Sequence, residues 1–233
     1  MSYKKSEDTK NLIMQTAGKL FYEKGYHATT VREIALVSGL SLSRLNYHFA
    51  GKDAVAATIC KQFLKSLDEQ VISHVFPLTN QLLLKDVIHI RLILKAFISL
   101  EIHMKFYYEI VCENILSDIL VRSSLPHFKE QFEYSHQTAS DQYLQGCSHV
   151  FTAALVEFIK CRHEGDPNLS EEELLDVFND MHLKQLNIPK NEREDVMQQA
   201  KRITGNMYFQ METLSCVKIR IKEEPDQNQE VAL

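Results

Sequence analysis

Side chains that can hydrogen-bond to DNA are concentrated between Ser41 and Lys52, in the sequence SLSRLNYHFAGK. Arg44 can donate two hydrogen bonds to a guanine edge, and such a pair is worth about 1–3 kcal/mol of discrimination between bases. Asn46 carries the donor and acceptor that match adenine, and Ser43 can bond to a base or a phosphate. The alternative for all three is contact with phosphate or water alone, which carries no sequence information.

A helix-turn-helix would present these side chains to DNA. Thr30 begins the first helix as the N-cap of a T-x-x-E capping box. Gly39 stands at the turn, where a left-handed backbone favours Gly, and Ser41 is the N-cap of the second helix. Ala35 lets the second helix approach closely, while Leu45 fills the gap between the two helices. This spacing predicts that the second helix lies in the major groove.

Residues 10–55 resemble the DNA-binding end of the TetR (tetracycline-repressor) family of bacterial transcription regulators. The family pattern combines L-F-x-x-x-G-[YF], T-T-x-x-x-I-A and Y-x-H-F-x-x-K at fixed spacing. The matching residues are Leu20, Phe21, Gly25, Tyr26, Thr29, Thr30, Ile34, Ala35, Gly39, Leu40, Ser41, Leu45, Tyr47, His48, Phe49 and Lys52. The chain departs from the pattern at Asn46, where the family usually has a phosphate-contacting Tyr. It also departs at Ser43 and Arg44, where Gly and a small residue are usual, so no operator sequence can be transferred.

The resemblance implies further contacts with DNA. Tyr47, His48 and Lys52 match family positions that face the phosphate backbone, where contacts fix the register and give salt-dependent affinity. For His48 the alternative is a packed aromatic ring. The hydroxyls of Thr30 and Ser41 are also within reach of phosphate, although helix capping alone explains both residues. The predicted DNA-binding set is Thr30, Ser41, Leu42, Ser43, Arg44, Asn46, Tyr47, His48 and Lys52.

The charge distribution fits DNA binding by one end of the chain. The net charge is −5 over 233 residues. Residues 1–52 contain eight Lys and Arg against four acidic residues, whereas the remainder contains 18 against 27. A basic end on an acidic body concentrates the attraction for phosphate at that end.

The sequence predicts an all-α fold. Only 7 Gly and 5 Pro occur, and apolar residues recur at helical spacing, which together indicate nine or ten helices. The resemblance implies a TetR-like arrangement in which a larger helical body follows a three-helix head. The predicted domains are a helix-turn-helix DNA-binding domain over 1–51, a helical effector-binding and dimerisation domain over 52–217, and a disordered tail over 218–233.

Several helices of the body can be placed from their apolar residues and prolines. A long helix after Gly51 would link the head to the body, and Pro126 is expected to separate two helices. Ser170 and Glu173 form a capping box, and Pro189 opens the last helix. The apolar face of that last helix is expected at Val196, Ala200, Ile203, Met207 and Met211.

The resemblance also implies a homodimer on a palindrome-like operator, with recognition helices about 34–36 Å apart. Residues 148–163 and 192–214 are the candidate dimer helices, because their apolar stripes are long; the alternative is packing within one chain. The family usually binds a small apolar or amphipathic effector in the body, and residues 82–145 are the expected lining. Its polar groups would be His89, His103, Tyr107, Asn114, Tyr134 and Gln137, although each residue alone is more commonly exposed or satisfied in a core. Such an effector would release a repressor from its operator by favouring a mismatched head separation.

Other function classes find less support in the sequence. The patterns HExxH, GxSxG and the P-loop are absent, and Cys161-x-His163 is too small a cluster for a site, so we expect no enzyme, no cofactor and no metal ligands. Scattered His and Cys leave a metal- or redox-sensing regulator as an alternative. A helical enzyme or an interaction protein would not explain the basic head. Five Cys without CxxC and a polar start without a signal peptide predict a cytoplasmic protein.

Overall fold

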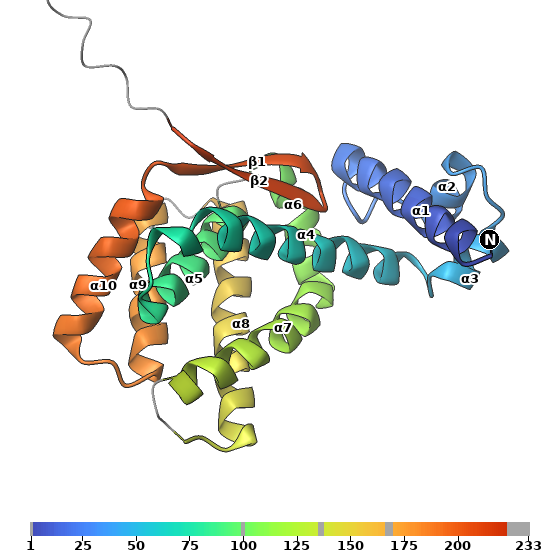
Figure 1. Cartoon of the computed structure of the whole chain (residues 1–233). Helices are drawn as coiled ribbons and strands as arrows, with labels where there is room; N and C mark the ends of the chain where they lie inside the picture. Colours follow the sequence, from blue (N-terminus) through green and yellow to red (C-terminus); the bar gives the residue numbers. More distant parts are fainter. Residues whose placement is uncertain (1, 99–100, 135–137, 166–169, 223–233) are drawn as a thin grey trace, which may run out of the picture.

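The computed structural model describes residues 2–98, 101–134, 138–165 and 170–222, which fold as ten α-helices, one 3₁₀ turn and a small hairpin (Figure 1). The head contains α1 (Ser2–Lys24), α2 (Val31–Val37) and α3 (Leu42–His48). The body contains α4 (Lys52–His74), η1 (Phe76–Leu78), α5 (Leu82–Ile98), α6 (Glu101–Cys112), α7 (Ile115–Tyr134), α8 (Asp141–Glu164), α9 (Glu171–Gln185) and α10 (Lys190–Thr204). Strands β1 (Met207–Thr213) and β2 (Cys216–Ile221) follow α10.

Helix α4 joins the head to the body, as its apolar spacing predicts. It runs from beside α3 into the body, where it lies next to the hairpin (Figure 1). The predicted face is buried at Val55, Ile59, Phe63, Leu67 and Val71. Burying an apolar side chain of this size contributes about 1.5–3 kcal/mol, so the five residues hold α4 firmly in the core.

Helix α5 lies at the centre of the body. It contacts α4, α6, α8, α9 and α10, and most of its side chains are buried. Arg91 on α5 is only 1% exposed, and its guanidinium pairs with Glu172 and with Asp176 of α9, the latter at 2.7 Å. A buried cation needs such partners. No described helix has the length and apolar character needed to cross a membrane.

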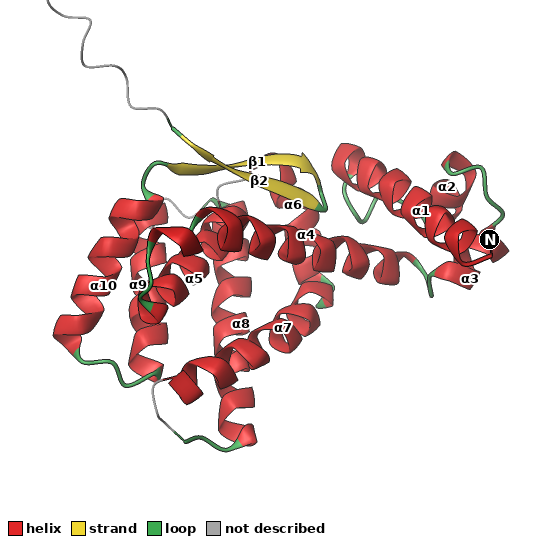
Figure 2. Cartoon of the chain, viewed as in Figure 1, coloured by secondary structure: helices red, strands yellow, loops and turns green. Residues whose placement is uncertain are grey.

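The C-terminal region corrects the expected disordered tail, because residues 216–221 form a strand (Figure 2). Strand β2 pairs antiparallel with β1, and alternate residues are buried along both strands. On the other side of β2, Ser66 of α4 accepts from Val217 N and donates to Val217 O, both at 3.2 Å. Gln70 Oε1 accepts from Ile219 N at 3.2 Å. The strand is ordered because α4 side chains satisfy its second edge; residues 223–233 lie outside the described part.

Two helix boundaries were also predicted wrongly. Pro126 lies inside α7 and does not separate two helices. Apolar residues on both sides of the proline, Leu120 and Phe128 among them, are buried, and the continuous helix packs on α8. The break between α6 and α7 is instead at Asn114, whose φ of 59° ends the helix. The last helix stops at Thr204, and Met207 lies in β1.

Candidate nucleic-acid interface

The predicted helix-turn-helix forms, and local hydrogen bonds set both helix starts. Thr30 Oγ1 accepts from Glu33 N at 3.2 Å, and Ser41 Oγ accepts from Arg44 N at 3.3 Å. Gly39 has a φ of 66°, which confirms the left-handed turn between the helices. Only half of the first capping box is seen among the described contacts, because the carboxylate of Glu33 pairs with Lys24 of α1. The second box, at Ser170 and Glu173, is complete.

Helix α3 presents the predicted base-reading residues outward. Leu45 is fully buried, as expected of the residue that fills the gap between α2 and α3. Around it Tyr47 is 83% exposed and Leu42 is 38% exposed. The predicted base contacts Ser43, Arg44 and Asn46 are also exposed. One helix face therefore combines a guanidinium, an amide and a hydroxyl, which are the groups that read base edges in the major groove.

Arg44 and the neighbouring polar residues keep most of their hydrogen-bonding capacity for a ligand. Among the residues that the structure describes, Arg44 Nη2 makes one long contact, 3.5 Å to Thr9 Oγ1 of α1. The hydroxyls of Ser41 and Ser43 lie 3.1 Å apart. The ring of His48 is half-buried and packs edge-on against Tyr47, with ring centres 5.1 Å apart. The weak contact with Thr9 would leave the guanidinium of Arg44 able to turn toward DNA.

Lys52 is held by the head rather than directed only at solvent. Its Nζ donates to Tyr26 O at 2.9 Å and lies 4.0 Å from the centre of the Tyr26 ring. The Tyr26 hydroxyl in turn donates to Asp53 Oδ1 at 2.5 Å. Burial, together with the Asp53 carboxylate, raises the pKa of Tyr26, so its hydroxyl stays protonated as a donor. These contacts join the turn after α1 to the start of α4.

We therefore expect Lys52→Ala to affect stability as well as DNA affinity. The change removes a charged hydrogen bond and a cation–π contact, and should lower the free energy of unfolding by about 2 kcal/mol. Chemical denaturation would measure this loss. Lys61→Ala, which removes the same charge from an exposed position of α4, serves as the control and should change stability by less than about 0.5 kcal/mol. Equal effects of the two substitutions would contradict the structural role of Lys52.

The turn after α1 is also attached to α6. Glu109 accepts hydrogen bonds from the backbone N–H groups of Tyr26 and His27, the latter at 3.1 Å. Gly25 has a φ of 90°, and a side chain at this position would collide with the Glu109 carboxylate. Glu113, just after α6, pairs with His27 at 2.8 Å. We call this set of contacts around Glu109 the head–body latch.

The four predicted effector residues whose side chains the structure describes lie in separate surroundings. His89 pairs with Asp68 at 2.8 Å, and the buried Tyr107 donates to Leu214 O at 3.0 Å. Burial raises the pKa of Tyr107, so this hydroxyl serves as a donor within the core. Asn114 is exposed in the turn before α7, and Tyr134 is exposed at the end of α7. Gln137 and the His103 side chain lie outside the described part of the chain.

A cleft of about 450 Å³ lies instead between α9 and α10. Its lining is mostly charged, unlike the apolar pocket expected within residues 82–145. Arg193 and Lys184 both pair with Asp180, at 2.8 and 2.6 Å, and Lys201 pairs with Asp176 at 3.2 Å. Burial would raise the pKa of Asp180, but Lys184 and Arg193 outweigh it and lower that pKa. The charged groups thus neutralise one another across the cleft.

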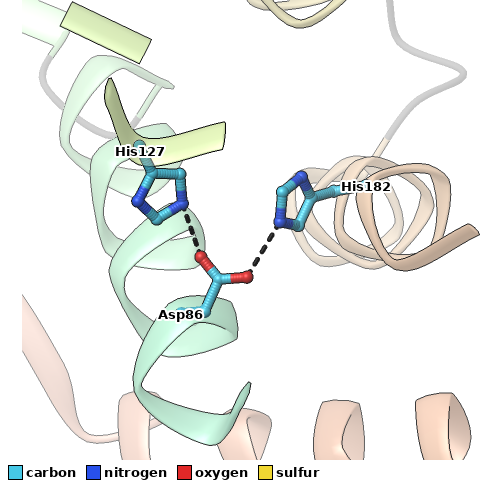
Figure 3. Close-up of side chains that lie close together, drawn as sticks. All are labelled: Asp86, His127 and His182. Atoms are coloured by element: carbon cyan, nitrogen blue, oxygen red, sulfur yellow. Dashed lines mark hydrogen bonds and ion pairs between the residues drawn. The ribbon is translucent and has the colours of Figure 1, made fainter. Parts of the chain in front are cut away.

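The body contains a buried cluster that the sequence did not predict (Figure 3). Asp86 of α5 lies 2.5 Å from His127 Nε2 of α7 and 2.8 Å from His182 Nε2 of α9. Burial would raise the pKa of Asp86, but the charges of His182 and His127 outweigh it and lower that pKa. Asp86 and His182 are 96 positions apart, so no local spacing could have indicated this cluster.

Comparison with known proteins supports the geometry of the head. Residues 13–59 match the family model described as bacterial regulatory proteins, tetR family. The chain is 35% identical over 57 positions to YerO of Bacillus subtilis (strain 168), which is described as an uncharacterised HTH-type transcriptional regulator. It is 34% identical over 55 positions to YttP of the same organism, which is also described as an HTH-type transcriptional regulator. Each alignment covers 24% of this chain, but only 20% of YerO and 27% of YttP.

The whole fold also has solved counterparts. A crystal structure of a protein described as a TetR-family transcriptional regulator, from Syntrophomonas wolfei str. Goettingen, aligns with a TM-score of 0.56 at 16% identity, over 78% of this chain and 96% of that one. A protein described as a transcriptional regulator, from Rhodococcus sp. RHA1, aligns with a TM-score of 0.52 at 15% identity, over 79% and 98%. At these identities the likeness concerns the fold alone. The head of the chain therefore matches the tetR family of bacterial regulatory proteins over residues 13–59, and the chain shares its overall fold with these two solved structures.

Proposed function

We propose that this protein is a sequence-specific DNA-binding transcription regulator that acts in the cytoplasm. The observation that carries the proposal is the exposed face of α3, where Ser43, Arg44 and Asn46 surround the buried Leu45. The excess of Lys and Arg in residues 1–52 adds attraction for phosphate at the same end of the chain. An enzyme or an interaction scaffold would require neither feature.

Selection of bound fragments from a random DNA pool tests this proposal with the full chain. We expect a near-palindrome whose half-sites lie about one helical turn apart, since two recognition helices would enter adjacent major grooves. The selection is repeated after the protein has been unfolded and refolded without ligand, so that a bound effector cannot mask the activity. Failure to enrich any sequence with the refolded protein would overturn the proposal.

A homodimer would bring two copies of α3 to such an operator, and α8 offers the better surface for it. The stripe Phe151, Leu155 and Ile159 is buried within the chain, but Val150 is 49% exposed. Ala154 and Phe158, on the same side as Val150, are only half-buried. The other candidate, residues 192–214, is less suited, because the apolar side of α10 is buried and α10 packs against α5.

Substitution of Val150 by Asp is expected to weaken dimerisation by at least about tenfold. Each dimer would bury two copies of the new carboxylate, and an unpaired buried charge is strongly unfavourable. Sedimentation equilibrium would measure the dissociation constant. Leu78→Asp is the control, since Leu78 is 57% exposed on η1, away from α8. If Val150→Asp dimerised as tightly as this control, the α8 surface would not be the interface.

We further propose that a small-molecule effector releases the protein from its operator, as in a repressor. Helix α6 supports this idea because it contacts both the head and the hairpin. Glu109 holds the turn after α1, while Tyr107 donates to the backbone between β1 and β2 at 3.0 Å. A ligand that favours a shifted α6 would therefore also shift the head. It can do so only to the extent that it binds the two arrangements with different affinity.

A further inference from the structure

Asp86, His127 and His182 converge from three helices of the body, well away from α3 (Figures 1 and 3). One ligand atom from each residue can be chosen so that all three lie within 4.8 Å of one another. The side chains of Asp86 and His182 are fully buried, and that of His127 is 22% exposed. A carboxylate oxygen and two imidazole nitrogens therefore face one small volume that is reached from the His127 side.

Hydrogen bonding within the cluster is incomplete. His182 Nε2 and Asp86 Oδ2 form a hydrogen bond of 2.8 Å. His127 Nε2 forms an ion pair with Asp86 Oδ1 at 2.5 Å, but neither atom has a hydrogen bond of regular geometry among the described residues. Buried polar atoms without a regular hydrogen bond are rare and require an explanation. Both atoms are good metal ligands that point into the same space.

The surroundings of the cluster also favour a cation. Asp68 and Glu130 both exert a negative potential at His127, in addition to that of Asp86. Asp68 pairs with His89 at 2.8 Å, and the His89 and His127 rings are 5.7 Å apart. Three carboxylates thus act on one buried site whose other members are imidazoles.

We propose that Asp86, His127 and His182 bind a divalent transition-metal ion of the zinc class. Two imidazole nitrogens and one carboxylate oxygen form a common protein donor set for Zn²⁺, with bonds of about 2.0–2.2 Å. Tetrahedral bonds of this length require donor atoms about 3.3 Å apart. The two histidines now contact different oxygens of Asp86, and one ligand atom from each residue lies within 4.8 Å of the others. Side-chain movements of about 1–2 Å would therefore bring the three donors to the tetrahedral spacing. Each histidine would bind the ion through an unprotonated Nε2 and keep one proton on Nδ1, so a neutral ring shifts its proton from Nε2 to Nδ1, whereas an imidazolium releases its Nε2 proton to solvent. The fourth position would face the partly exposed side of His127.

Binding of Co²⁺ alone to the full chain tests this inference, independently of any DNA activity. The protein is stripped with a chelator and titrated, because tetrahedral Co²⁺ has a visible spectrum and can be displaced by Zn²⁺. We expect one ion per chain and a raised melting temperature. His127→Ala and His182→Asn should each weaken Co²⁺ binding by about 100-fold or more, since even outer-shell partners of a metal site contribute about 10–100-fold. His89→Gln, which keeps all three ligands, should bind Co²⁺ within a few-fold of the parent.

Circular dichroism establishes which variants fold. If His182→Asn does not fold, His127→Ala decides the question, because the His127 side chain is partly exposed and its loss leaves a smaller buried defect. The absence of saturable binding by the parent would overturn the inference. Undiminished Co²⁺ binding by the folded His127→Ala variant would overturn it as well.

Discussion

Arg44→Ala should reduce affinity for the selected operator by about 1–3 kcal/mol at each half-site, which is roughly 5- to 150-fold. Affinity for unrelated DNA should fall much less, because one phosphate-facing charge is a small part of non-specific binding. The loss at the operator is expected because Arg44 lies on the exposed face of α3 and, among the described residues, its guanidinium makes only a 3.5 Å contact, to Thr9. Its guanidinium is therefore able to form the bidentate pair with guanine. Titration of both DNAs at one salt concentration measures the difference.

Two control substitutions separate base reading from charge. Arg44→Lys keeps the positive charge but cannot form the planar fork, so it should also lose specificity. Lys19→Ala removes one charge from an exposed position of α1, and should leave the ratio of operator to unrelated affinity unchanged. If Arg44→Ala weakened binding to both DNAs equally, Arg44 would be a phosphate contact. Asn46 and Ser43 would then remain as the candidate base contacts.

Glu109→Gln should lower the free energy of unfolding by about 2 kcal/mol. The Glu109 side chain is only 11% exposed and accepts from the backbone N–H groups of Tyr26 and His27. Both donors bond to the same oxygen, Oε2, so the amide oxygen of Gln can still accept from both, but without the negative charge. Hydrogen bonds to a charged group are worth about 1.5–3 kcal/mol each, against about 0.5–1.5 kcal/mol for bonds between neutral groups. Chemical denaturation of the full chain measures the loss.

Glu113→Gln provides the matched comparison for the head–body latch. Glu113 is half-exposed and pairs with His27 at 2.8 Å, and a surface ion pair contributes only about 0–1 kcal/mol. We expect Glu113→Gln to have little effect on stability. A loss for Glu109→Gln that is no larger than that for Glu113→Gln would show that the latch does not hold the head to the body.

The head was predictable from the sequence because its determinants are local. The N-caps Thr30 and Ser41, the turn at Gly39 and the plug at Leu45 lie within one short segment, and each acts on its immediate neighbours. The same holds for the long helix α4, whose buried residues recur every four positions. The capping box at Ser170 was predicted from the same kind of local spacing, and it is complete in the structure.

Features that depend on contacts distant in the sequence were not predictable. The strand at 216–221 forms because Ser66 and Gln70 of α4, about 150 positions earlier, bond to its backbone. Pro126 stays helical because α7 packs on α8, where the ring of Phe128 meets that of Phe151. Neither contact could be predicted from the residues next to it in the sequence.

The body illustrates the same limit for candidate sites. The polar residues expected in an effector pocket were chosen by type alone, and the structure gives His89 and Tyr107 separate partners. Glu109 meets Tyr26 across 83 positions, and the Asp86 cluster joins three helices. Only the packing of those helices reveals such sets of residues.

Binding of a labelled duplex, measured by fluorescence anisotropy as a function of salt, tests the central claim most directly. The duplex carries the selected near-palindrome, and a scrambled duplex of equal length is the comparison. We expect the protein to prefer the selected duplex by at least about 10³-fold, and we expect its affinity for both duplexes to fall steeply as salt rises. Equal affinity for the two duplexes would contradict sequence reading by α3, and an affinity independent of salt would contradict DNA binding by the basic head.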